Sequence, residues 1–357
     1  MITKMLRQNP IYFLLVALPL AIIADLLHWA PLAVFILSAV AVIPLAGMIG
    51  DATEHLAVRT GPKIGGLLNA TLGNAAELII TLIAIREGLL DLVKASITGS
   101  ILGNLLLVMG FAMLLGGLKN GHQSFDRKQS GNHAILLTIS VMALVIPSLF
   151  SHYIGPDDSM PVEILSLSVS GVMIILYILG LLFSLRETKQ GAITYQPEKT
   201  HERHWPVKKS LTMLAIATLG VVWMSEMLVG AVEAVTVSLG LSEFFLGIIL
   251  IPLIGNVAEH LVAVQVAIRN KMDLSVEVAV ASSLQIALFV APLLVFVSLI
   301  MGNPLTLIFN QFELLALIAA VVIAALVSSD GESNWLEGAA LLAVYTILGI
   351  AFFMMPG

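Results

Sequence analysis

Long apolar stretches, separated by short polar segments, occupy most of the chain. Each comes close to the about 20 residues that a helix needs to cross the ~30 Å hydrocarbon core of a bilayer. Eleven can be recognised, with approximate bounds 11–29, 31–50, 67–86, 93–117, 133–151, 162–185, 210–236, 243–268, 275–300, 308–328 and 334–355. The pattern predicts an all-α integral membrane protein with about eleven transmembrane helices. The first stretch lacks a convincing small-residue cleavage site and is interpreted as a retained helix.

The composition indicates that lipid is the solvent of this chain. Hydrophobic residues make up 59% of the 357 residues and charged residues only 11%, and the mean hydropathy is +1.01. A soluble domain carries about 25% charged residues, so a water-facing surface cannot be built from so few. The net charge of −6 and the lack of a basic stripe argue against a nucleic-acid partner.

Cysteine is absent from the chain. Its absence excludes disulfides, thiolate metal sites and cysteine nucleophiles. The lack of thiolates favours hard, oxygen-preferring ions at any cation site.

Basic residues lie mainly on one side of the predicted spans. Of the 17 lysines and arginines, only Arg86 and Lys94 fall on the side opposite to the N-terminus. Basic loops stay in the cytoplasm according to the positive-inside rule. We therefore expect a cytoplasmic N-terminus and an external C-terminus in the plasma membrane.

One sequence motif occurs twice in the chain. Gly73-Asn74-Ala75-Ala76-Glu77 in the third stretch recurs as Gly255-Asn256-Val257-Ala258-Glu259 in the eighth, at an offset of 182 positions. The same offset relates further residues, and a shorter echo links the second and seventh stretches. These pairs are Asp91 with Asp273, Ser100 with Ser282, Leu102 with Leu284, and Thr53-Glu54 with Ser225-Glu226.

The spacing of the repeat predicts the organisation of the chain. Matched helices are five spans apart, and an odd offset means that they cross the membrane in opposite senses. Such inverted repeats place the substrate near the bilayer midplane, between interrupted helices of both halves. We expect an extra helix in 1–30, a five-helix repeat in 31–185, a cytoplasmic linker in 186–209 and a second repeat in 210–357.

Glu77 and Glu259 are the main candidates for chemistry. Each lies inside an apolar stretch, where an ionised carboxylate costs several kcal/mol unless it is paired, hydrated or protonated. One divalent cation between them neutralises both charges, and two protons do so equally well. A pair that alternates between these states is a physical basis for cation/proton antiport. The alternative is two independent carboxyls, each protonated or hydrogen-bonded to a neighbouring helix.

The Gly-Asn prefix of each motif suits a cation site. Asn74 and Asn256 lie three residues before the motif glutamates and share a helix face with them. Gly73 and Gly255 allow close backbone approach and local opening of the helix, although packing alone also explains them. Ca²⁺ takes about six to eight oxygen ligands in flexible geometry, whereas Mg²⁺ requires a stricter octahedron. Carboxylates, amides, freed carbonyls and water supply the former more naturally.

Polar side chains also follow one face of the fourth and ninth stretches. Serine in a membrane helix often bonds back to its own backbone, whereas an unsatisfied amide in lipid is costly. The amides are therefore the stronger candidates to contact the site. The predicted second ring consists of Ser100, Asn104, Ser282 and Gln285, with Ser283 as a neighbour.

Other acidic residues are weaker candidates. Glu54 and Glu226 are related by the repeat and are predicted to form a proton pathway or gate, although a solvated helix end also explains Glu54. Asp91 and Asp273 either cap the helices that follow or attract cations from opposite faces. His260 points about 100° away from Glu259 and is not expected to be a ligand.

These motifs resemble the paired repeats of Ca²⁺/H⁺ antiporters, the cation/proton exchanger (CAX) branch of the Ca²⁺/cation antiporter superfamily, and are most similar to bacterial members. Surrounding segments agree from about residue 45 to the C-terminus. They are 65–71, 99–104, 270–285 and 330–338. The resemblance implies Ca²⁺ held by Glu77 and Glu259 with Asn, Ser and Gln neighbours, and sliding of the second and seventh helices during alternating access.

The resemblance has limits. The central loop lacks the acidic helix of some eukaryotic relatives, and the basic N-terminal extension of plant relatives is absent, so neither form of regulation is expected. Some family members form trimers, and a homo-oligomer is compatible with this sequence.

Three rival functions are weighed against Ca²⁺/H⁺ exchange. A Na⁺/Ca²⁺ exchanger, or an antiporter for another divalent cation such as Mn²⁺, has the same architecture. Its repeats typically carry proline before the motif glutamate, where this chain has Ala76 and Ala258. A channel more often builds its pore from symmetric subunits. An enzyme is disfavoured because no catalytic motif of the HExxH or GxSxG type is present.

The orientation can be tested with reporters fused to each terminus. We predict a cytoplasmic signal from the N-terminal fusion and an external signal from the C-terminal fusion, because the basic residues divide so unequally. Reporters on the same side of the membrane would exclude an odd number of spans and, with it, the inverted repeat.

Overall fold

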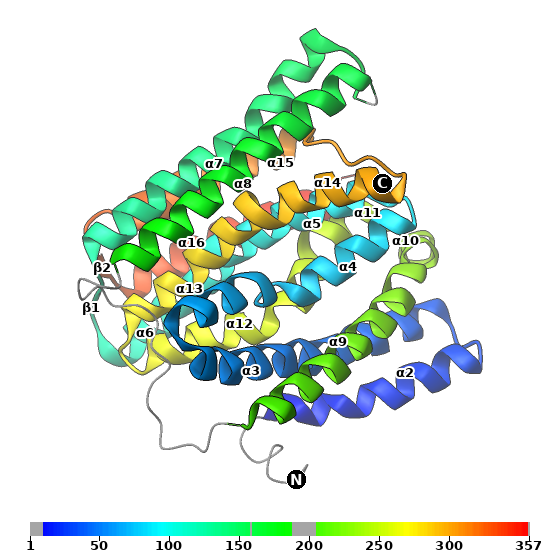
Figure 1. Ribbon diagram of the computed structural model, residues 1–357, viewed down its shortest axis with the longest axis horizontal. Coiled ribbons are helices and arrows are strands. Elements are labelled where there is room, and N and C mark those ends of the chain that lie inside the picture. Colours follow the sequence, from blue (N-terminus) through cyan, green and yellow to red (C-terminus); the bar gives the residue numbers. More distant parts are fainter. Residues whose placement is uncertain (1–9, 158, 188–204, 356–357) are drawn as a thin grey trace.

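The structure is a computed structural model that describes residues 10–157, 159–187 and 205–355. The described chain is almost entirely helical, and its helices lie side by side in several layers (Figure 1). Two short strands, β1 (Gln123–Ser124) and β2 (Glu332–Ser333), pair in antiparallel fashion, with Gln123 opposite Ser333.

The described part of the first half contains nine helical elements. They are η1 (Pro10–Val16), α2 (Ala17–Leu26), α3 (Pro31–Leu72), α4 (Ala75–Arg86), α5 (Leu90–Leu102), η2 (Gly103–Val108), α6 (Met109–Asn120), α7 (Arg127–Ile154) and α8 (Met160–Glu187). Because α5, η2 and α6 follow one another without a break, they form one long helix.

The second half has a similar order of elements. They are α9 (Val207–Gly230), α10 (Val232–Leu239), α11 (Glu243–Phe245), η4 (Leu246–Leu250), α12 (Ile251–Ile268), α13 (Met272–Gln285), η5 (Ile286–Val290), α14 (Ala291–Met301), α15 (Gln311–Val327) and α16 (Trp335–Phe353). The elements η2, η4 and η5 are π-helical turns within longer helices.

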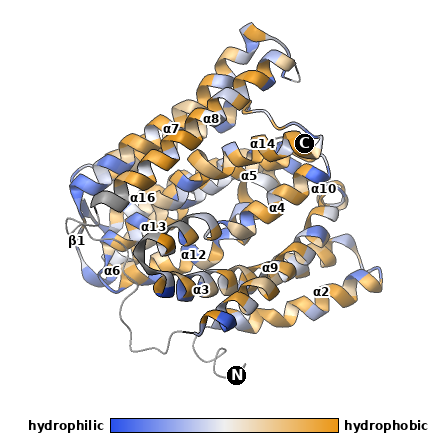
Figure 2. Cartoon of the chain, viewed as in Figure 1, coloured by the Kyte–Doolittle hydropathy of each residue, from blue (hydrophilic) through white to orange (hydrophobic). Residues whose placement is uncertain are grey.

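Within the described residues, eight helical segments are long and apolar enough to cross a membrane by length and composition. Two shorter apolar helices, Pro10–Leu26 and Gln311–Val327, accompany them. Hydrophobic residues cover most of the helices, and hydrophilic residues gather towards their ends (Figure 2). The predicted all-α membrane class is therefore confirmed. Most of the predicted linker 186–209 lies outside the described residues.

Helix α3 differs from the predicted pair of spans at 31–50 and 67–86. It runs without a break from Pro31 to Leu72 and bends sharply on the way. A Cβ placed on Gly65 would lie 2.6 Å from the carbonyl oxygen of Ala57, whereas a straight helix separates such residues by about 12 Å. The bend therefore lies between Ala57 and Gly65.

Glycines bring the central helices into backbone contact. Gly99 of α5 packs against the backbone of Ile248 in η4, and Gly247 lies against Leu92 and Ala95. Small residues at membrane-helix interfaces permit this approach, which gains dispersion contacts where lipid gives no hydrophobic drive between helices. The contacts hold α5 beside the helix that carries the second motif.

The close packing predicts different outcomes for two substitutions in one helix. An alanine at Gly99 would place its Cβ against the carbonyl oxygen of Ile248 and 2.7 Å from Cγ of Pro252, whereas no atom lies within 4 Å of the corresponding position at Gly103. We expect Gly99→Ala to destabilise the protein by about 1–3 kcal/mol, a typical cost of overpacking.

The loss of stability is measured by heating the purified variants to a series of temperatures and determining the folded fraction that remains by size-exclusion chromatography. Gly103→Ala is the matched control and should unfold near the parent temperature. Equal stability of the two variants would contradict the backbone contact described here.

Candidate functional site

The two copies of the repeated motif face each other at the centre of the bundle. The first lies at the break between α3 and α4, and the second lies within α12. A Cβ on Gly73 would lie 3.1 Å from Oε1 of Glu259, and one on Gly255 would lie 3.6 Å from Cβ of Glu77. Each motif glycine therefore lies beside the glutamate of the other motif, and the approach is tight at Gly73 alone of the two.

The first glutamate is held in a closed polar cluster, which we call the Glu77 cluster. The Ser100 hydroxyl of α5 donates to Oε1 of Glu77. The amide of Asn256, from the other motif, donates to Oε2 of Glu77 at 3.4 Å and lies 3.4 Å from the Ser100 hydroxyl. All three side chains are buried, and Glu77 is only 2% exposed.

The second glutamate is the centre of a related cluster, the Glu259 cluster. The Ser282 hydroxyl lies 3.0 Å from Oε2 of Glu259 and 3.3 Å from the amide oxygen of Asn74. The Asn74 amide in turn donates to Oε1 of Gln285 at 2.8 Å. In both clusters, a glutamate contacts a serine 23 positions later in its own half. Each cluster also contains an asparagine from the other half of the chain.

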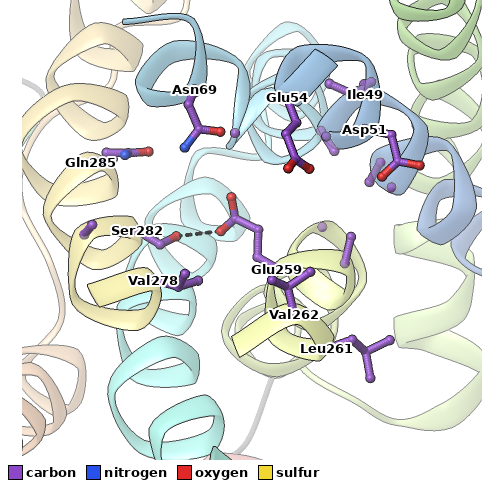
Figure 3. Close-up of a pocket in the computed structure, with 18 of the residues that line it drawn as sticks. Ile49, Asp51, Glu54, Asn69, Glu259, Leu261, Val262, Val278, Ser282 and Gln285 are labelled. Atoms are coloured by element: carbon purple, nitrogen blue, oxygen red, sulfur yellow. Dashed lines mark hydrogen bonds between the residues drawn. The ribbon is translucent and has the colours of Figure 1, made fainter. Parts of the chain in front are cut away.

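The Glu259 cluster opens to a cavity. The cavity has a volume of about 270 Å³, which is room for several water molecules. Residues of α3, α12 and α13 make up most of its lining, and Ile11 of η1 and Ala76 of α4 add to it. Figure 3 shows the Glu259 carboxylate beside Ser282, with Glu54 and Asn69 on the facing wall. A hydrated ion in the cavity therefore reaches Glu259 before Glu77.

Within the two hydrogen-bonded clusters, Glu77 and Glu259 are the charged side chains, while Glu54 and Glu277 line the adjoining cavity. Among the described residues, no group of three or more His, Asp or Glu side chains is arranged to hold a metal ion. The remaining groups of both clusters are neutral amides and hydroxyls. Two carboxylates can be balanced by one divalent cation or by two protons, so the site suits the exchange of one for the other.

Local helix geometry changes beside both clusters. The π-helical turn η2 begins three residues after Ser100, and η5 begins directly after Gln285. Such turns are rare and are often found at functional sites. Asn104 lies within η2 and is buried, and its amide nitrogen has no hydrogen-bond partner among the described residues. Among the described residues, no hydrogen bond joins it to either cluster, and its place in the second ring stays a prediction.

The predicted local opening of the motif helices occurs on one side only. Helix α3 ends at Leu72 and α4 begins at Ala75, so Gly73 and Asn74 interrupt the helix. Helix α12 runs unbroken through Gly255 and Asn256. The expectation of an opening is therefore wrong for the second motif in this conformation, in which the prefix lies within the regular helix.

The acidic residues outside the motifs have diverse surroundings. Glu54 lines the cavity and is not a helix end, because α3 continues past it. Glu226 pairs with Arg86 at 3.0 Å and its side chain is 44% exposed. Asp91 pairs with Lys94 at 2.7 Å, and Asp273 accepts from the backbone nitrogen of Asp126 at 2.6 Å.

Two minor predictions can now be assessed. Neither Asp91 nor Asp273 caps its helix, since both helices lack a side-chain cap at their first turn. The capping prediction was therefore wrong. His260 is not part of either cluster, and its Nε2 has no hydrogen-bond partner among the described residues.

Sequence reasoning missed Glu277 of α13, which lines the same cavity as Glu54 and Glu259. The signal was a carboxylate in an apolar stretch. It was overlooked because the residue at the repeat offset is Ala95, so a search for duplicated positions passes over it. Asn69 also lines the cavity and was noted only as part of a wider similarity.

The fold and the site define an integral membrane protein that holds a polar, doubly acidic centre inside a helical bundle. The sequence profile of the sodium/calcium exchanger protein family matches residues 30–186 and 209–354. The chain belongs to this family.

Individual relatives match over nearly their whole length. The Ca(2+)/H(+) antiporter of Aphanothece halophytica is 47% identical over 367 residues, which cover 99% of this chain and 98% of the relative. The Ca(2+)/H(+) antiporter ChaA of Bacillus subtilis is 44% identical over 354 residues, covering 98% and 100%. These matches confirm the resemblance to Ca²⁺/H⁺ antiporters.

Solved structures share the fold. The structure of native YfkE is 41% identical, with a TM-score of 0.85, and the match covers 97% of this chain and 100% of that one. The H+/Ca2+ exchanger CAX has a TM-score of 0.71 at 14% identity, covering 99% and 93%, and supports the fold alone.

The unequal access of the two clusters can be measured with cysteine, because the parent chain has none. We expect Ser282→Cys, beside the cavity, to react faster with a membrane-impermeant thiol reagent than Ser100→Cys, whose position is 1% exposed. The two positions are related by the repeat, so each is the control for the other. Equal labelling rates would contradict the one-sided cavity.

Proposed function

We propose that this chain is a secondary active transporter that exchanges Ca²⁺ for H⁺ by alternating access. The observation that carries the proposal is the pair of reciprocal clusters around Glu77 and Glu259. Each combines a carboxylate, a hydroxyl and an amide drawn from both halves of the chain. Relatives named Ca(2+)/H(+) antiporter, at 44–47% identity, support it.

The ligand groups suit Ca²⁺ as the transported substrate. Glu77 and Glu259 would supply the negative charge, and the oxygens of Asn74, Asn256, Ser100, Ser282 and Gln285 would add neutral ligands. Ca²⁺ accepts such mixed oxygen ligands, with water completing the shell. Gly73 contributes by leaving space for Glu259, and Gly255 lies beside Glu77.

The same groups also serve the protonated state. Without Ca²⁺, two ionised carboxylates inside an apolar bundle would repel each other and lose hydration, so each binds a proton. A hydroxyl donates or accepts according to its rotation. Ser100 and Ser282 can therefore donate to an ionised carboxylate or turn a lone pair towards a cation. Proton and Ca²⁺ thus compete for the same oxygens.

Access to the site alternates in this proposal between the two faces of the membrane. The open cavity reaches Glu259 and extends past Glu54 and Glu277. The cavity extends along α12 towards the basic residues Arg269 and Lys271. With the predicted orientation, in which the N-terminus is cytoplasmic, the cavity therefore opens to the cytoplasm. Glu54 and Glu226 are proposed to line or gate the proton pathway at the two ends.

The proposed architecture has eleven spans, with one extra helix followed by inverted repeats in 31–185 and 210–357. Two features support it. The family profile matches the two halves separately, and the two glutamate–serine contacts span the same separation of 23 residues. The predicted extra helix contains η1 and α2.

Exchange of Na⁺ for Ca²⁺, or transport of Mn²⁺, is the alternative. The family profile is named for Na⁺/Ca²⁺ exchange, but Ala76 and Ala258 precede the motif glutamates here. Uptake into inverted vesicles that requires Na⁺ and ignores an imposed pH gradient would favour the alternative. We do not propose an enzymatic activity.

Glutamine substitutions test the roles of the two motif carboxylates. Glu77→Gln and Glu259→Gln keep the size of the side chain but remove its charge and its titratable proton. We expect each to abolish ΔpH-driven Ca²⁺ uptake and to weaken equilibrium Ca²⁺ binding, because a single carboxylate remains to face the divalent ion in a medium of low dielectric constant. The protein should remain folded and inserted.

The matched control is Glu233→Gln on α10, an exposed position outside the site, which should transport normally. Glu54→Gln and Glu226→Gln should affect turnover more than Ca²⁺ affinity. Near-normal exchange by either motif variant would show that the duplicated carboxylates are structural, and the proposed function would be wrong.

A further inference from the structure

Arg86 is one of only two basic residues on its predicted side of the membrane, and the transport site does not use it. It is the last residue of α4. Its Nη1 donates to Oε1 of Glu226 on α9 at 3.0 Å. Its Nε and Nη2 donate to Oε1 of the neighbouring Glu87 at 3.1 and 3.0 Å. The guanidinium therefore joins α4 to α9 through a direct ion pair.

This ion pair lies at the end of the bundle opposite to the cavity. The long helix from Met272 to Met301 provides the reference, because its first half lines the cavity between Glu277 and Gln285. Just beyond its far end, the Asn303 amide donates to the backbone oxygens of Ile85 and Arg86, at 2.8 and 3.4 Å. The second half of that helix thus separates Arg86 from the cavity.

The path between Glu77 and Arg86 is closed. Glu77 lies in the first turn of α4 and Arg86 at its end. Between them, Ile80 and Ala84 are each 1% exposed and Ile83 is 7% exposed. Alternating access to this side requires α4 and the helices that cover it to separate.

Helix α9 is the element that would have to move. It packs along α3, with which it forms a layer beside α2 (Figure 1), and it also contacts α4. Helix α4 carries Glu77, so it belongs to the site. A displacement of α9 relative to α4 that opens this end must therefore break the contact between Arg86 and Glu226.

We propose that the Arg86–Glu226 ion pair is a latch that favours the conformation with the cavity open and the opposite end closed. The proposal rests on the proposed alternating-access function. The pair is half exposed, with side chains 52% and 44% accessible, so it contributes modestly. A modest contribution is sufficient to bias two conformations of similar free energy.

The repeat predicts a second latch at the cavity end. Glu54 on α3 corresponds to Glu226 by the shorter echo, and it lines the cavity. The end of α12 corresponds to the end of α4, so the counterpart of Arg86 is Ile268, and Arg269 follows at the C-cap of α12. If the two halves exchange conformations, Glu54 approaches Arg269 as the cavity closes and the Arg86–Glu226 pair opens.

The first latch can be tested without measuring transport. A single cysteine replacing Ala281, which lines the cavity, reports cavity opening through its labelling by a membrane-impermeant thiol reagent. The measurement is made on the purified, reconstituted protein without Ca²⁺. Because the chain has no cysteine of its own, the signal arises from the reporter alone.

Glu226→Gln and Arg86→Gln should each slow labelling by about two- to fivefold, the shift expected from loss of one exposed ion pair. The double reversal Arg86→Glu with Glu226→Arg should restore the parent rate. Glu87→Gln is the matched control, because it removes the other carboxylate beside Arg86 and leaves the latch intact. It should label like the parent.

Parent-like labelling of both single variants, or failure of the folded double reversal to restore the rate, would overturn the latch. This outcome leaves Ca²⁺/H⁺ exchange untouched, since labelling does not depend on transport. Conversely, loss of exchange in a variant with parent-like labelling would concern the site and not the latch.

The second latch is tested with cysteines at both Glu54 and Arg269 and a short bifunctional thiol cross-linker. Cross-linking should be faster when Arg86→Gln is also present, since that variant favours the closed cavity. Cross-linking that is equal or slower with Arg86→Gln would show that the repeat-related pair does not form.

Discussion

Two carboxylates inside an apolar bundle are the constraint on which the rest of the structure depends. An isolated ionised carboxylate in such surroundings is costly, and a second one in a neighbouring cluster adds to that cost. The structure meets this constraint with hydroxyls and amides: Ser100 and Asn256 contact Glu77, and Ser282 contacts Glu259. These partners reduce the cost but leave the negative charge to be balanced. The proposed exchange follows, because Ca²⁺ and protons are alternative ways to balance it.

The packing of the bundle follows from bringing the two glutamates together. Gly73 packs so closely against Glu259 and the backbone of Asn69 that a Cβ there would be crowded, whereas Gly255 lies in ordinary van der Waals contact with Glu77. Backbone contact between Gly99 and Ile248 holds α5, and hence Ser100, beside the second motif. One glutamate then remains buried while the other faces the cavity. The two related half-sites therefore differ in their access to solvent, as a single conformation of an alternating-access transporter requires.

Much of this could be predicted from the sequence because it is carried by local pattern. Apolar length predicted the membrane helices, and the duplicated motif identified Glu77, Glu259, Asn74 and Asn256, which the structure brings together. The contacts of Ser100 and Ser282 followed from the same offset. Features without a local signature were missed. The bend of α3 brings Gly65 into contact with the backbone of Ala57. The Arg86–Glu226 ion pair joins residues 140 positions apart in the sequence. Glu277 has no acidic counterpart at the repeat offset. Asn104 matched the pattern, but among the described residues no hydrogen bond joins it to either cluster, because polarity indicates a need for partners without specifying them.

The central claim is that Ca²⁺ and protons occupy the same pair of carboxylates. Proton release on Ca²⁺ binding to the purified protein tests it most directly, measured by calorimetry in buffers of different ionisation enthalpy. Ligands must lose their protons to bind a metal, so we predict release of up to about two protons per Ca²⁺ near the pH at which both carboxyls are protonated. Glu77→Gln and Glu259→Gln should each reduce the release per bound ion. Ca²⁺ binding with no proton release across the pH range would contradict the account.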